Sequence, residues 1–159
     1  METKIDSRII GIFAILGIMM IVAAIYMNWV SVIDTYSGYS GFQVGDLVSD
    51  SDYDDWQQNV PMIVFILGLI MLILELISIL MPEKSKKIEA VMPTINFIFG
   101  LIILIVCICF AVWDLFDYQP LGEDVYKAGA GVWVALIGAL IGICGNAGQV
   151  FATYKKKEA

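Results

Sequence analysis

The chain has 159 residues, of which 60% are hydrophobic and only 16% are charged, and its formal net charge is −7. A soluble domain normally has about a quarter of its residues charged, so this composition favours a membrane protein over a soluble one. The acidic balance argues against nucleic acid as a partner, because proteins that bind it present basic surfaces to the phosphates.

Four apolar runs follow one another along the chain, each long enough to cross a hydrocarbon core about 30 Å thick. Because a helix satisfies its backbone hydrogen bonds internally, we expect four transmembrane helices rather than membrane strands. They are predicted over residues 9–30, 61–81, 93–113 and 128–151. The first run is longer than the apolar region of a secretory signal and lacks a small-residue cleavage site, so we expect it to be retained.

Basic residues are concentrated in the segments on one side of the predicted membrane and are nearly absent from those on the other side. All of the nine Lys and Arg residues except Lys127 lie before the first helix, in the loop 82–92 or after the fourth helix. The positive-inside rule then predicts a multi-pass plasma-membrane protein with both termini cytoplasmic, an inner loop at 82–92, and outer loops at 31–60 and 114–127. The four tryptophans fall near the outer helix ends, where such rings favour the membrane interface.

The first outer loop has the composition of a small β-hairpin. The segments "VSVIDTY" (30–36) and "FQVGDLV" (42–48) contain β-branched or aromatic residues in partial alternation, and two Ser-Gly pairs between them favour turns. We expect this loop either to cap the bundle or to bind a partner. The predicted fold class is an all-α integral membrane protein, a four-transmembrane-helix antiparallel bundle, with a candidate β-hairpin in the first extracytoplasmic loop.

The stretch "SDSDYDDW", residues 49–56, resembles the start of an EF-hand calcium loop, whose acids stand at positions 1, 3 and 5. The match then fails, because position 6 is Asp55 where glycine is needed and position 12 is Pro61 where a glutamate is needed. We predict no dedicated metal site, only an acidic outer patch that attracts cations weakly and nonspecifically. It consists of Asp50, Asp52, Asp54 and Asp55.

Nothing in the sequence points to an enzyme or to a cofactor. The chain has no histidine and no Walker loop, nucleophile elbow or zinc spacing. Its three cysteines fall inside predicted helices, where cysteine usually serves as a small buried hydrophobe. We therefore expect a non-catalytic protein.

Glu75 is the most informative residue, because an ionisable group at membrane depth is costly and is a functional candidate by default. Uncharged polar residues are predicted at a similar depth in the inner leaflet, namely Ser78, Asn96, Asn146 and Gln149. One interpretation is an ion or proton site built around Glu75. The other, which we prefer on sequence grounds, is interhelical hydrogen bonding, with roughly 0.6 kcal/mol contributed per bond.

Small residues repeat along one face of the fourth predicted helix at heptad spacing. This packing seam consists of Ala128, Gly131, Ala135, Gly138, Gly142 and Gly145. Small residues let helix backbones approach closely, so the seam is expected to serve the chain's own bundle or to dock another subunit. The first helix offers a matching face, which favours the internal role, at Gly11, Ala14 and Gly17.

The layout resembles that of claudins and other four-span proteins, with inner termini, a larger first outer loop with some strand, and a short inner turn. The Gly-Leu-Trp and paired cysteines of the claudin first loop and the Cys-Cys-Gly of tetraspanins are absent. The resemblance therefore implies topology and transfers no functional residue.

Three functions are compatible with these features. The preferred prediction is a structural or accessory subunit that associates laterally with itself or with other membrane subunits. The first alternative is a small ion or proton channel or transporter subunit that uses Glu75 and the nearby polar groups. The second is a surface receptor or adhesin that acts through loop 31–60.

Overall fold

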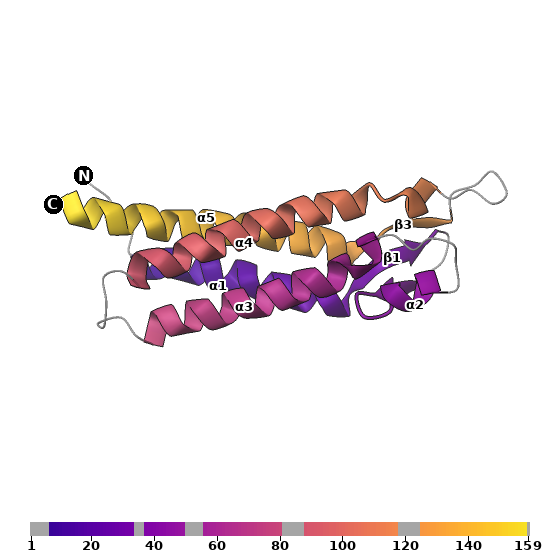
Figure 1. The fold of residues 1–159 in the computed structure, drawn as a ribbon, viewed down its shortest axis with the longest axis horizontal. Coiled ribbons are helices and arrows are strands. Elements are labelled where there is room, and N and C mark those ends of the chain that lie inside the picture. Colours follow the sequence, from indigo (N-terminus) through magenta and orange to yellow (C-terminus); the bar gives the residue numbers. More distant parts are fainter. Residues whose placement is uncertain (1–6, 34–36, 50–55, 81–87, 118–124, 159) are drawn as a thin grey trace.

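The computed structural model describes residues 7–33, 37–49, 56–80, 88–117 and 125–158. Within these ranges four long helices lie along the long axis of the molecule, and each runs antiparallel to its neighbours in the bundle (Figure 1). They are α1 (Ser7–Ala23), α3 (Val60–Leu80), α4 (Ile88–Ala111) and α5 (Ala130–Glu158). All four include stretches long and apolar enough to cross a membrane, which confirms the predicted number of such helices.

Each helix of the bundle has two neighbours. α5 packs against α1 and α4, and α3 packs against α4 and α1. α3 and α5 therefore face each other across the bundle rather than lying side by side. Contact between those two helices depends on long side chains that reach into the interior.

α1 and α5 form the most extensive contact in the bundle. A Cβ atom added to Gly17 would lie 2.6 Å from the carbonyl oxygen of Gly138, and one added to Gly145 would lie 2.6 Å from the backbone nitrogen of Ala14. Real Cβ atoms do not come this close to backbone atoms. The two backbones can lie against each other only because these positions are glycine.

A small sheet covers one end of the bundle, which we call the sheet end (Figure 1). Its strands are β1 (Asn28–Val32), β2 (Gly38–Ser40) and β3 (Tyr126–Ala128), in the order β2-β1-β3 and antiparallel throughout. A short helix, α2 (Val44–Ser49), lies beside the sheet, and 3₁₀ turns occupy Ala24–Tyr26, Trp56–Asn59 and Asp114–Asp117. Because β1 pairs with strands from both loops at this end, the sheet ties the two loops together.

Trp29 fixes the sheet to the bundle. Its ring is fully buried, its Nε1 donates a hydrogen bond to the carbonyl oxygen of Ala24 at 2.8 Å, and its ring packs edge-on against Phe110 at 5.3 Å. Its own carbonyl accepts a hydrogen bond from the backbone nitrogen of Gly129. Like Trp29, Trp113 is buried, so two of the four tryptophans belong to the core and do not face a membrane interface.

Several predicted helix limits differ from the structure, and among them the fourth helix, predicted to end at 151, continues to Glu158. The first helix was expected over 9–30 but becomes β1 from Asn28, because a run of apolar residues does not distinguish a buried strand from a helix. The third helix begins at Ile88 and continues through Pro93, which lies inside the helix and lacks the N–H for one intrahelical hydrogen bond. The fourth begins at Ala130, because Ala128 pairs with Val30 in the sheet.

The predicted β-hairpin is present, but only one of its two strands overlaps the segments predicted for it. β1 and β2 pair, but "FQVGDLV" contributes to α2 instead of forming a strand. Val44 is buried and Leu47 is partly buried, and this spacing of three residues puts both on one side of a helical turn. β3, from the second loop, was not predicted.

The α1–α5 contact predicts opposite outcomes for two glycines. Gly17→Ala should lower the free energy of unfolding, because its methyl group meets the α5 backbone, an overpacking that costs about 1–3 kcal/mol. Gly142→Ala is the matched control, since a Cβ there meets nothing within 4 Å. Its stability should stay level or rise by up to about 1 kcal/mol, the helix propensity gained. Equal losses in detergent unfolding experiments would contradict this packing.

The pairing of the two loops predicts a specific crosslink. Ser31 lies directly opposite Lys127 in the β1–β3 register, and such partners have Cα atoms about 4.5–5.5 Å apart, within disulfide range. Ser31→Cys combined with Lys127→Cys should therefore form a disulfide on mild oxidation, detected by non-reducing peptide mass spectrometry. Ser31→Cys alone and Ser31→Cys with Lys155→Cys are the controls. The same bridge yield in a control, or none in the pair, would refute the register.

Candidate functional site

Glu75 lies on the inward face of α3. That face continues through Val64, Gly68 and Met71, which are buried and spaced three or four residues apart. Glu75 occupies the next position of this stripe, and its side chain is 0% exposed. The helix therefore places a carboxyl group where the rest of its inward face is apolar.

Two amide side chains from other helices donate hydrogen bonds to this carboxyl group. Asn96 Nδ2, from α4, lies 3.2 Å from Glu75 Oε2 and 3.3 Å from the backbone oxygen of Met71. Gln149 Nε2, from α5, lies 2.9 Å from Glu75 Oε1. Since α3 and α5 are opposite each other in the bundle, Glu75 and Gln149 meet in its interior. We call Glu75, Asn96, Asn146 and Gln149 the Glu75 cluster.

Gly11 provides the room for Gln149. A Cβ atom at this position of α1 would lie only 3.2 Å from Gln149 Nε2. The absence of a side chain on α1 thus lets Gln149 point toward Glu75. The sequence marks Gly11 as part of a packing face, and its place beside the polar group was missed because single-helix spacing does not show which residues meet across a bundle.

The cluster contains more acceptors than donors. Asn96 Oδ1, Asn146 Oδ1 and Gln149 Oε1 are buried and have no hydrogen-bond partner, and among the described residues the only other such side-chain atom is Gln57 Oε1, at the sheet end. An unsatisfied buried polar atom costs about 1–3 kcal/mol. Asn96 and Gln149 are the two amides hydrogen-bonded to Glu75, so two of these three oxygens belong to side chains in direct contact with the buried carboxyl group.

In the described structure neither Asn146 nor Ser78 is hydrogen-bonded to Glu75. Asn146 Nδ2 donates to the backbone oxygen of Gly142 on its own helix at 2.7 Å, which leaves its Oδ1 as the unpartnered atom. Asn146 and Gln149 are one turn apart on α5, so both belong to the same region of the bundle. Ser78 is only partly buried, and no hydrogen bond joins it to Glu75 in the described structure.

Most of the packing seam is in contact with other parts of the same chain, namely α1 and Trp29. Gly138 and Gly145 lie against α1, and a Cβ at Gly131 would come within 2.6 Å of the ring of Trp29. Ala135 is fully buried, whereas Ala128 lies in β3 and is not part of the helix. The aspartates of the outer acidic patch, residues 50–55, lie outside the described residues.

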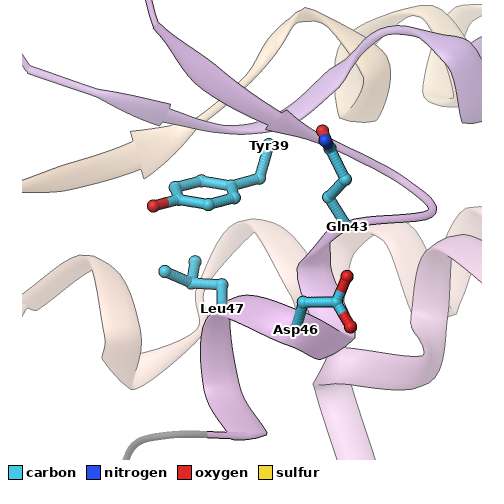
Figure 2. Close-up of a pocket in the computed structure, with 4 residues that line it drawn as sticks. All are labelled: Tyr39, Gln43, Asp46 and Leu47. Carbon is cyan, nitrogen blue, oxygen red and sulfur yellow. The ribbon is translucent and has the colours of Figure 1, made fainter.

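The sheet end carries a shallow hollow between the β2–α2 connection and α2. Figure 2 shows the ring of Tyr39 and the side chain of Gln43 on one side and Leu47 and Asp46 of α2 on the other. Gln43 Oε1 accepts hydrogen bonds from the backbone nitrogen and the hydroxyl group of Ser40, at 3.1 and 3.0 Å, and so braces the turn. The hollow is open and offers one carboxylate, which makes it a less developed site than the Glu75 cluster.

Among the described residues, no group of three or more His, Cys, Asp and Glu side chains is placed to hold a metal ion. The chain matches no model of a known protein family and no curated protein sequence. Its function is therefore inferred from its own geometry.

Proposed function

We propose that the chain is an integral membrane protein and that its Glu75 cluster is a site of cation translocation, for a proton or a small monovalent cation. Membrane insertion is supported by the length and composition of the helices, the least hydropathic of which still has a mean hydropathy of 1.8 over its best window. Large apolar side chains are exposed along the outside of the bundle, including Ile12, Ile73, Ile105 and Leu140. Lipid chains cover such surfaces without cost.

The sheet end is proposed to face the outside of the plasma membrane. The positive-inside rule supports this orientation, since in the sequence all basic residues except Lys127 belong to the N-terminal segment, the segment between α3 and α4, or the C-terminal segment. Exposed aromatic rings at the sheet end fit the membrane–water interface, and they include Tyr26, Phe42, Trp56 and Trp133. Glu75 then lies in the inner half of the membrane.

The observation that carries the proposal is the buried Glu75 carboxyl group contacted by two amides, Asn96 and Gln149, whose oxygens have no partner among the described residues. A cluster that served only to join helices would be expected to satisfy its polar atoms, as buried networks do. An amide group can instead present its NH₂ to an ionised carboxylate, or its oxygen to a protonated carboxyl or a cation. Asn96 and Gln149 can therefore accommodate both charge states of Glu75 by rotating their ends.

A short polar stripe on α5 leads from the cluster toward the cytoplasmic end. Asn146, Gln149 and Thr153 are three and four residues apart, which places them on one helix face. Toward the sheet end the interior is apolar, with Ile103 and Phe110 buried. We therefore propose that the site exchanges ions with the cytoplasmic side in this conformation.

The structural or accessory role has less support from the geometry. Its best sequence feature was the small-residue seam, and that seam is covered by α1 and Trp29 in the folded chain. The receptor role has only the shallow hollow beside Tyr39. We retain the proposal of a non-catalytic protein, which agrees with a site made of one carboxyl group and three amides.

The proposal predicts Glu75-dependent ion flux. The purified chain, reconstituted in lipid vesicles, should carry protons or sodium ions down a gradient faster than protein-free vesicles do, as read from dyes trapped inside. Glu75→Gln should reduce this flux to the protein-free level, because it removes the only charge of the cluster. Ser78→Ala, one turn away on the same helix, is the control and should leave the flux unchanged. Wild-type flux in the Glu75→Gln vesicles would exclude the proposed site.

A further inference from the structure

We infer that the Glu75 cluster binds an alkali metal cation and that Na⁺ is the ion it fits best. The inference rests on the proposed function, since it names the ion at the proposed translocation site. It starts from the buried, unpartnered oxygens of Asn96 and Gln149, whose NH₂ groups contact the Glu75 carboxyl group, and from that of Asn146, one turn from Gln149 on α5. Carboxylate and carbonyl oxygens are the ligands that hard cations prefer.

The charge of the cluster selects a monovalent ion. As a carboxylate, Glu75 would contribute one negative charge; it is fully buried and forms no ion pair with a basic side chain in the described structure. A divalent ion would leave an uncompensated positive charge inside the bundle, which is strongly unfavourable. A monovalent ion neutralises the carboxylate, and the occupied site then carries no net charge.

Binding requires only the ends of two side chains to turn. Asn96 and Gln149 now direct their NH₂ groups at Glu75, with nitrogen–oxygen distances of 3.2 and 2.9 Å. A half-turn of each amide exchanges its nitrogen for its oxygen and brings carboxylate and amide oxygens toward one point. Because these groups are already in direct contact, a small ion such as Na⁺ separates the helices less than K⁺ does.

Isothermal titration calorimetry of the full chain in detergent tests this inference, with NaCl as the probe at mildly alkaline pH and choline chloride holding the ionic strength constant. The wild type should bind Na⁺ saturably and more tightly than K⁺. Glu75→Gln should abolish binding, and Asn96→Leu should weaken it about tenfold, as expected for the loss of one ligand. Ser78→Ala should bind as the wild type does.

Sodium binding that survives Glu75→Gln, or equal affinities for K⁺ and Na⁺, would overturn the inference. If Glu75→Gln fails to fold, Glu75→Asp keeps the carboxylate and should bind Na⁺ more weakly but still saturably. Glu75-dependent proton flux without sodium binding would reject the sodium site and leave the proposed function standing. Sodium binding without any Glu75-dependent flux would reject translocation and leave the sodium site standing.

Discussion

The close contact between the backbones of α1 and α5 is the constraint on which the rest of the structure depends. Gly17 on α1 and Gly138 and Gly145 on α5 leave no room for a Cβ atom at the interface. The same contact continues to the sheet end, where Gly131 lies against Trp29 and α1 leads into β1. One helix pair thus connects the closed interior of the bundle to the sheet that joins its two loops.

This contact also determines the polar chemistry of the interior. Gly11 leaves space beside α5, and Gln149 uses that space to reach Glu75 across the bundle. Asn96 completes the contact from α4, so three helices meet at one carboxyl group. The amide nitrogens of Asn96 and Gln149 donate hydrogen bonds to Glu75, while their oxygens have no partner among the described residues. Such oxygens suit a ligand that carries positive charge.

Much of the fold is predictable from the sequence, because uninterrupted apolar runs of about 20 residues form helices long enough to cross a membrane. The depth of Glu75, Asn96, Asn146 and Gln149 is likewise predictable from their positions along the helices. Which of these residues touch is not, since it depends on the order of helices around the bundle and on the rotation of each helix. The strand expected within 30–36 lies at 28–32, but its pairing partners at 38–40 and 126–128 were missed, because they lie in two different loops.

The hydrogen-bonded contact between Glu75 and Gln149 across the bundle is the central claim, and a double-mutant cycle tests it most directly. The free energy of unfolding would be measured in detergent for the wild type, Glu75→Leu, Gln149→Leu and the double variant. Residues in direct contact typically show a coupling energy of about 0.5–3 kcal/mol, and we expect at least about 1 kcal/mol here. Additive effects, with a coupling below about 0.5 kcal/mol, would mean that the two side chains do not interact and would contradict the account.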